Sequence, residues 1–218
     1  MTRGLIKICG VTTADDAALA VELGVDLIGV NLYPQSPRYA LPQNVPSILE
    51  AIGDTAEGIA VLVEPTKESL LGPAPHLAAM QTIQWHGAGH EPRPWLKRSL
   101  VAAFGIAGDE DLAAIRQYVD SCRREGCLPR AVLIDAVCRG LHGGTGKTAP
   151  WHALAGFDPG VPIILAGGLK PENVAEAIRT VRPDGVDVAS GVEVAPGRKS
   201  REKMRRFVEA AREAFERN

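Results

Sequence analysis

Polar side chains that could take part in catalysis or binding alternate with apolar ones along several short runs of the chain. Apolar neighbours such as Ile6 and Ile8 must face a core, so the polar set must point to the opposite side. Thiol, imidazole and carboxyl groups, the usual groups of acid–base chemistry, all occur in it. The set comprises Lys7, Cys9, Asn31, Gln84, His86, Asp135 and Asp187. The alternative is a structural ion-pair lattice, for example Lys7 with Asp187, because buried charges need partners.

These side chains belong to a series of β-branched runs that punctuate the whole chain. The runs are Leu5 to Cys9, Leu27 to Leu32, Ile59 to Val63, Thr82 to His86, Val101 to Ile106, Ala131 to Asp135, Val161 to Ala166 and Gly185 to Ala189. An average spacing of roughly 27 residues leaves room for one strand and one helix per unit. We therefore predict an α/β fold, a single-domain (β/α)8 barrel of parallel strands spanning residues 1–218. A doubly wound open sheet is the runner-up.

Helix signals separate most of these runs. Thr13 to Asp16 reads as a capping box, Pro171 as a first-turn proline, and Ser200 as the cap of a final helix. The third and fourth units are weak because prolines interrupt them, at Pro73, Pro75, Pro92 and Pro94. In a closed barrel the polar faces of the runs would converge on the interior, mostly near the carboxyl-terminal mouth where barrel enzymes place their chemistry.

Composition narrows the class of protein. Lys and Arg total 24 and Asp and Glu total 26, a formal net charge of −2 that argues against a nucleic-acid binder. No apolar run approaches the roughly 20 residues of a membrane span, and no secretory signal is visible. The four cysteines form no C-x-x-C pair and show no zinc-like spacing. We expect a cytoplasmic protein with reduced thiols that binds neither nucleic acid nor membrane, as a monomer or homodimer.

Two glycine-rich patterns that often bind nucleotides fail on spacing. The segment 142–148 ends like a P-loop, but that motif requires a glycine five positions before Gly146, and position 141 is Leu. Gly144 begins a loose dinucleotide fingerprint nine residues beyond Asp135 rather than directly after the strand. We interpret this segment as a mobile loop that closes over a ligand, with a plain surface loop as the alternative.

Glycines after the last two runs favour a phosphate site. Gly167 and Gly168 follow the seventh run, and Ser190 and Gly191 follow the eighth. Glycine lets main-chain amides approach a ligand closely, and the loops after strands seven and eight of a barrel often form a phosphate site. The two segments together therefore predict one.

The ordered series of motifs resembles the phosphoribosylanthranilate isomerase family. The motifs, which run from residue 7 to about 199, are Lys7-Ile-Cys-Gly10, Tyr33-Pro-Gln-Ser-Pro-Arg-Tyr39, Gln84-Trp-His-Gly87, Gly143-Gly-Thr-Gly146, Leu165-Ala-Gly-Gly-Leu169, Pro171-Glu-Asn173 and Asp187-Val-Ala-Ser-Gly-Val-Glu193. The resemblance implies an enzyme of tryptophan biosynthesis. Its reaction would be an Amadori rearrangement of N-(5-phosphoribosyl)anthranilate to 1-(2-carboxyphenylamino)-1-deoxyribulose 5-phosphate.

The resemblance also implies a role for each site residue. Cys9 would be the general base and Asp135 the general acid. Arg38, in a loop stiffened by prolines, would hold the anthranilate carboxylate, whose planar shape suits a guanidinium fork. The other substrate-binding candidates are Asp187, which would orient the substrate, His86, which would line the site, and the phosphate-binding residues Gly167, Gly168, Ser190 and Gly191.

The chemistry is compatible with these residues. An acid must protonate the ribose ring oxygen and a base must remove the C2′ proton, so the reaction needs no metal or redox cofactor. Cys9 must be a thiolate to act, and nearby Lys7 is expected to favour that form.

Three departures from the family pattern do not touch the acid or the base. They are Trp85 before His86, the sequence after Gly146, and an insertion spanning Cys122 to Pro129. Two other readings remain open. One is a histidine-pathway aminoaldose isomerase, which would use paired Asp residues. The other is a phosphosugar-binding protein without catalysis, which would lack Cys9 or Asp135.

Overall fold

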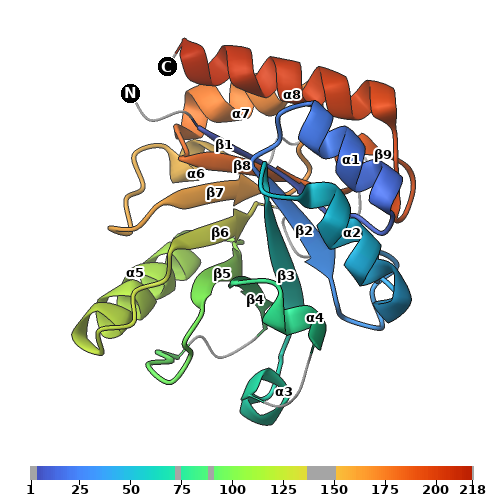
Figure 1. Ribbon diagram of the computed structural model, residues 1–218. Coiled ribbons are helices and arrows are strands. Elements are labelled where there is room, and N and C mark those ends of the chain that lie inside the picture. Colours follow the sequence, from blue (N-terminus) through green and yellow to red (C-terminus); the bar gives the residue numbers. More distant parts are fainter. Residues whose placement is uncertain (1–3, 72–74, 88–90, 137–150, 218) are drawn as a thin grey trace.

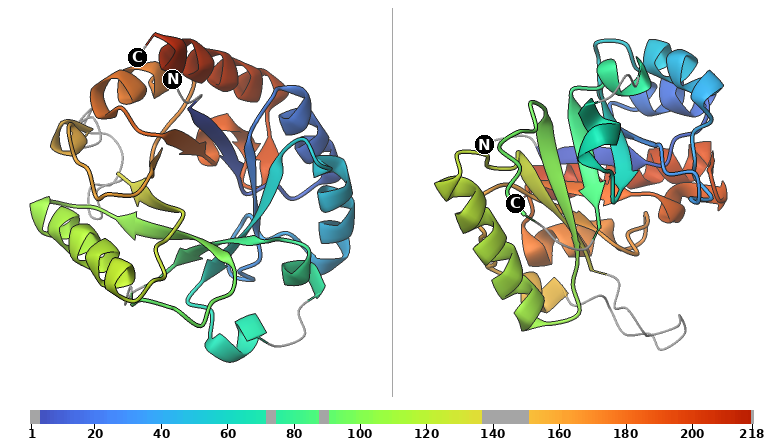
Figure 2. Two further views of the ribbon diagram at one scale, coloured as in Figure 1. Left: turned by 60° about the vertical axis from the view of Figure 1, so that its left-hand side comes forward. Right: turned by 90° about the horizontal axis from the view of Figure 1, so that it is seen from below.

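The computed structural model describes residues 4–71, 75–87, 91–136 and 151–217. Eight parallel strands close into a barrel in chain order, and the last strand pairs with the first. In the left view of Figure 2 these strands form a ring and the helices lie outside it. The strands are β1 (Leu5–Cys9), β2 (Leu27–Asn31), β3 (Glu57–Val63), β4 (Thr82–His86), β5 (Ser99–Gly105), β6 (Ala131–Asp135), β7 (Ile163–Ala166) and β8 (Gly185–Val188). The predicted (β/α)8 barrel is confirmed, and the open sheet is wrong.

The helices follow the strands around the outside of the barrel (Figure 1). They are α1 (Ala14–Glu22), α2 (Val45–Ile52), α3 (Lys67–Leu71), α4 (Pro75–Ala78), α5 (Asp109–Arg124), α6 (Trp151–Leu154), α7 (Val174–Val181) and α8 (Arg201–Glu216), with 3-10 turns η1 (Pro42–Asn44) and η2 (Ser190–Val192). Thr13 and Ser200 are confirmed as N-caps, because Thr13 Oγ1 accepts from the Asp16 amide at 3.2 Å and Ser200 Oγ from the Lys203 amide at 3.3 Å. Of the predicted capping box only the Thr13 half is present, and Asp16 Oδ2 accepts from the Lys199 amide.

One helix start was predicted wrongly. Helix α7 begins at Val174, and Pro171 lies in the turn that precedes it. Asn173 organises this turn, since its Oδ1 accepts from the Lys170 amide at 2.8 Å and its Nδ2 donates to the Gly168 carbonyl at 3.0 Å. The proline therefore shapes the loop after β7 rather than the first turn of the helix.

The third and fourth units are irregular, as their prolines predicted. Helices α3 and α4 have five and four residues. Between β4 and β5, the residues that the structure describes (87 and 91–98) contain no helix. In place of a helix, the Arg93 guanidinium lies 3.7 Å from the centre of the outward-facing Trp85 ring.

Two apolar cores confirm the predicted faces of the strands. Residues such as Ile6, Ile8, Val132 and Ile134 pack outward against the helices. A smaller cluster fills the barrel interior below the polar mouth, made of Leu27, Ile59, Val101, Ala103, Ala131, Leu133, Ile164 and Ala166. The alternation of side chains along a strand explains this separation. None of the described helices has the length and apolar character needed to cross a bilayer.

A short hairpin after β8 was not predicted. Strands β9 (Glu193–Ala195) and β10 (Arg198–Lys199) pair antiparallel outside the barrel sheet, around a turn in which Gly197 has φ +76°. A positive φ of this kind favours glycine. The hairpin returns the chain to the ends of β1 and β8 before α8 begins.

Candidate active site

Lys7 and Asp187 form an ion pair at the line where β1 meets β8. Their Cα positions lie opposite each other in the ladder, and Lys7 Nζ donates to Asp187 Oδ1 at 2.9 Å. Lys7 has no exposed surface and Asp187 is 7% exposed. Burial lowers the pKa of Lys7, but the charge of Asp187 and the hydrogen bonds to Asp187 and Cys9 outweigh it, so the pKa is raised and the lysine stays protonated. The Lys7–Asp187 ion pair that the sequence offered as an alternative is thus present, and both of its members belong to the candidate site.

Cys9 lies beside this pair at the end of β1. A Cβ atom at Gly29 would lie 2.9 Å from both Cys9 Sγ and Lys7 Nζ, so only glycine leaves room for the two groups. Burial raises the pKa of the Cys9 thiol more than Lys7 and Lys199 lower it. Lys7 favours the thiolate, as expected from the sequence, but the loss of solvation on burial outweighs this attraction and the net pKa of Cys9 is raised.

His86 lies on the same face of β4 as Gln84. The Nε2 atoms of the two side chains are 2.6 Å apart. Burial, reinforced by the charge of Lys7, lowers the pKa of His86. The neutral ring therefore accepts from the Gln84 amide at Nε2 and carries its proton on Nδ1. His86 can offer this Nδ1–H to a ligand in the mouth.

The lowered pKa of His86 predicts a loss of stability in acid. Because the unfolded chain binds the proton more readily than the folded protein, the free energy of unfolding should fall as the pH drops below about 6.5. Urea titrations across this range would show the decline reduced in His86→Asn and unchanged in His152→Asn, which alters an exposed histidine. Equal declines in wild type and His86→Asn would contradict the prediction.

Asp135 ends β6 and is half-buried. It lies in register with Gly105 of β5 and Ala166 of β7. Strands β1 and β6 are nearly opposite in the ring of eight, so Cys9 and Asp135 approach the mouth from different sides. The predicted loop after β6, the glycines at 143–146 and Cys138 lie outside the described residues.

Asn31 shapes a loop rather than the centre of the mouth. Its Nδ2 donates to Ser36 Oγ at 3.1 Å, and its Oδ1 accepts from the Tyr33 amide at 2.9 Å. Ser36 Oγ in turn accepts from the Arg38 amide at 3.1 Å. The end of β2 thereby fixes the main chain of the loop that carries Arg38.

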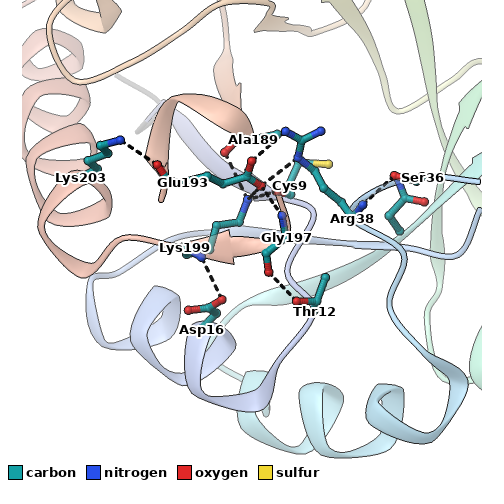
Figure 3. A network of polar contacts seen from close by, with 11 residues as sticks. Cys9, Thr12, Asp16, Ser36, Arg38, Ala189, Glu193, Gly197, Lys199 and Lys203 are labelled. Atoms are coloured by element: carbon teal, nitrogen blue, oxygen red, sulfur yellow. Dashed lines mark hydrogen bonds and ion pairs between the residues drawn. The ribbon is translucent and has the colours of Figure 1, made fainter. Parts of the chain in front are cut away.

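Arg38 is held by a partner that sequence reasoning missed. Its Nε donates to Glu193 Oε1 at 2.8 Å and its Nη2 to Glu193 Oε2 at 2.7 Å. These hydrogen bonds raise the pKa of Arg38. Figure 3 shows the guanidinium extending past Glu193 beside the Cys9 sulfur. About 24% of the side chain remains exposed, so Arg38 can still meet a ligand.

The loops after β7 and β8 approach each other closely. Gly167 and Gly168 have φ values of +91° and +64°, which favour glycine. A Cβ atom at Gly191 would lie 1.9 Å from the Leu169 carbonyl oxygen. The loop after β8 therefore packs at Gly191 against the loop that continues from Gly167 and Gly168, and the phosphate site expected there stays a prediction.

The close approach at Gly191 predicts that any side chain at this position lowers the stability of the protein. Gly191→Ala should lower the free energy of unfolding by about 1–3 kcal/mol, because one of the two loops must move. Urea denaturation would measure the loss. Gly108→Ala is the matched control, since nothing lies within 4 Å of a Cβ there and its φ of −171° suits any residue. Equal stability of the two variants would contradict the prediction.

A cavity of about 980 Å³ adjoins the mouth on the side of β3 to β5. His86, Gly87 and Gly105 line one wall, and Tyr118 of α5 lines another. Cys9, Asp135 and Asp187 are not among its lining residues, so the cavity lies beside the mouth, between α5 and the described part of the β4–β5 connection, which contains no helix. Within the described ranges, no three His, Cys, Asp or Glu side chains are grouped to hold a metal ion.

Comparison of this chain with known proteins confirms the family resemblance seen in its motifs. The family model of N-(5′-phosphoribosyl)anthranilate (PRA) isomerase matches residues 6–210. The chain belongs to this isomerase family. An N-(5′-phosphoribosyl)anthranilate isomerase of Geobacter sp. (strain M21) is 39% identical over 212 residues, which cover 95% of this chain and 97% of that protein.

Solved structures of phosphoribosylanthranilate isomerases share the fold. The Thermotoga maritima structure has a TM-score of 0.82 at 31% identity and covers 96% of this chain and 99% of that one. A second structure, with a TM-score of 0.78, 28% identity and the same coverage, holds reduced 1-(o-carboxyphenylamino)-1-deoxyribulose 5-phosphate. A further structure, 30% identical with a TM-score of 0.78 and the same coverage, describes the Thermotoga maritima isomerase as dimeric.

Two buried charged residues of this isomerase family member were not predicted as functional. Glu193 and Lys199 are 7% and 8% exposed and lie on the unpredicted hairpin. A local signal for the hairpin does exist, because Pro196-Gly197 separates two short segments in the way a turn does. The contact of Glu193 with Arg38 spans 155 positions and has no local signal.

Proposed function

We infer that this protein catalyses the isomerisation of N-(5-phosphoribosyl)anthranilate to 1-(2-carboxyphenylamino)-1-deoxyribulose 5-phosphate in tryptophan biosynthesis. The observation that carries the mechanism is the placement of Cys9 and Asp135 at the carboxyl ends of nearly opposite strands, β1 and β6. A sugar between them would meet a base on one side and an acid on the other. We propose that residues 1–218 act as one catalytic domain.

Asp135 begins the reaction as the general acid. It donates a proton to the ribose ring oxygen while the bond from that oxygen to C1′ breaks, which leaves a protonated Schiff base between C1′ and the anthranilate nitrogen. Cys9, as thiolate, then removes the C2′ proton, and the electron pair neutralises the iminium to give an enolamine. Tautomerisation yields the C2′ ketone. Each proton-transfer group typically contributes about 10²–10⁴-fold to the rate.

The remaining candidates hold the substrate. Glu193 occupies the Nε and Nη2 edge of Arg38, so the Nη1 and Nη2 edge remains available for the anthranilate carboxylate. The Nδ1–H of His86 and the second carboxylate oxygen of Asp187 supply a donor and an acceptor for sugar hydroxyls. Main-chain amides around Gly167, Gly168, Ser190 and Gly191 bind the phosphate.

The proposal includes a cytoplasmic location, because a thiol base needs a compartment that keeps cysteine reduced. It also includes assembly as a monomer or a homodimer. The dimeric Thermotoga maritima relative supports the second state.

One assay tests the function directly. Purified protein added to N-(5-phosphoribosyl)anthranilate should accelerate the loss of anthranilate-type fluorescence. A rate no greater than the spontaneous background, with correctly folded protein, would refute the proposal. Added inorganic phosphate should compete, since it occupies the predicted phosphate site.

A further inference from the structure

The Arg38–Glu193–Lys199 network links the hairpin to both Cys9 and the carboxylate-binding candidate. Glu193 Oε1 accepts from Lys199 Nζ at 2.9 Å, in addition to its two bonds from Arg38. Lys199 Nζ also donates to the carbonyls of Cys9 at 2.6 Å and Ala189 at 3.2 Å. In Figure 3 these groups converge from β1, the loop after β2, and the chain after β8.

Glu193 leaves Arg38 little freedom. A guanidinium held at Nε and Nη2 by both oxygens of one carboxylate has a fixed plane and a fixed direction. Burial raises the pKa of Glu193, but the hydrogen bonds from Arg38 and Lys199 outweigh it and keep the carboxylate charged. Gly10, with φ +72°, clears the path of the arginine, because a Cβ there would lie 2.6 Å from Arg38 Cδ. The direction of Arg38 is therefore set before any ligand binds.

Lys199 fixes the main chain of Cys9. Its ammonium group bridges carbonyls at the ends of β1 and β8, where the ladder of strand hydrogen bonds has ended. Lys199 itself is 8% exposed, and Glu193 balances its charge. Beyond the last paired residues, this bridge takes the place of a strand–strand hydrogen bond at the position of the base.

We propose that Glu193 and Lys199 are positioning residues for the isomerase reaction: Glu193 aims Arg38 at the substrate carboxylate, and Lys199 holds Cys9 at the distance from C2′ that proton transfer requires. This inference rests on the proposed function. Glu193 acts through Arg38 and Lys199 through the main chain of Cys9, so the two substitutions should affect different kinetic constants.

Glu193→Gln keeps the shape of the side chain and removes its charge. We expect KM to rise about 10-fold while kcat changes less than about 3-fold, because a lost charge-assisted hydrogen bond loosens substrate binding through Arg38. On an Arg38→Met background the same substitution should have no further effect on KM, since the two residues act as one unit. Glu202→Gln, which alters an exposed glutamate, is the matched control.

Lys199→Met should act on kcat instead. We expect a fall of about 10- to 100-fold with KM nearly unchanged, because a small displacement of a reacting group costs this much. Lys97→Met is the matched control at an exposed lysine. The dissociation constant of inorganic phosphate should be the same in all variants, which separates a local effect from general damage to the barrel.

Two results would contradict the positioning roles of Glu193 and Lys199. One is that Glu193→Gln and Lys199→Met have the same kinetic constants as their controls. The other is that Glu193→Gln still raises KM on the Arg38→Met background. If Glu193→Gln loses its cooperative unfolding transition, Glu193→Asp carries the same test, because a shorter carboxylate cannot reach Arg38 and Lys199 together. A wild-type protein that fails to accelerate the reaction would overturn the proposed function itself, whereas unaffected variants of an active protein would overturn only this inference.

Discussion

Replacing Cys9 by Ala is expected to lower kcat by about 10²–10⁴-fold, the usual contribution of a general base. The fold should survive, because the substitution removes one buried sulfur atom, introduces no clash and leaves only a small cavity. Steady-state turnover of N-(5-phosphoribosyl)anthranilate measures the loss. Cys127→Ala is the matched control, since it removes a free cysteine in the loop before β6, at the end of the barrel opposite to the mouth. Near-normal turnover by folded Cys9→Ala would remove Cys9 from the mechanism.

The raised pKa of Cys9 adds a pH dependence to this expectation. The base acts as a thiolate, so kcat/KM of the wild type should increase as the pH rises from neutrality toward the alkaline range. Cys9→Ala should lack this increase. Asp135→Asn should lower kcat by a similar factor through loss of the acid, with exposed Asp54→Asn as its control.

Asp187→Asn is expected to lower the free energy of unfolding by about 3–5 kcal/mol, because it leaves the Lys7 ammonium buried without its counter-charge. Urea denaturation at neutral pH measures the change. The double substitution Lys7→Met with Asp187→Asn should recover much of this stability, since it removes both charges from the interior. Activity should remain low in both variants, because Asp187 is also a candidate for binding the substrate.

The exposed pair Arg205 and Glu209 supplies the control for this prediction. Glu209→Gln breaks an ion pair of similar length, 2.8 Å, that lies on the surface of α8. Water solvates both partners there, so the expected change is at most about 1 kcal/mol. An effect of Asp187→Asn no larger than that of Glu209→Gln would mean that the buried pair contributes no more than a surface one.

The strands and their faces could be read from the sequence because they depend on local alternation. Strands β1, β4 and β6 have the predicted bounds. Strand β7 begins at Ile163 rather than Val161, since Pro162 has no amide hydrogen to donate and Asp184 Oδ2 accepts from the Ile163 amide. Strand β3 begins earlier than its apolar run, at Glu57, whose amide donates to the Asp26 carbonyl.

The sequence identified individual residues of the site but not the contacts between them. Motifs located Cys9 and Arg38, and the end of the sixth apolar run located Asp135; the structure places all three at or beside one mouth. The balance between burial and charge at Cys9 depends on neighbours from β1, β2 and the hairpin, and no local pattern encodes it. The hold of Glu193 on Arg38 likewise joins segments 155 positions apart.

The closure of the barrel through Lys7 and Asp187 also bears on how long the folded state persists. The two residues are 180 positions apart, so bringing them together costs more chain entropy than pairing two successive strands. We expect this contact to form after the rate-limiting step of folding. Weakening it should then accelerate unfolding far more than it slows folding. The same pair that borders the catalytic mouth would thereby set the lifetime of the native protein.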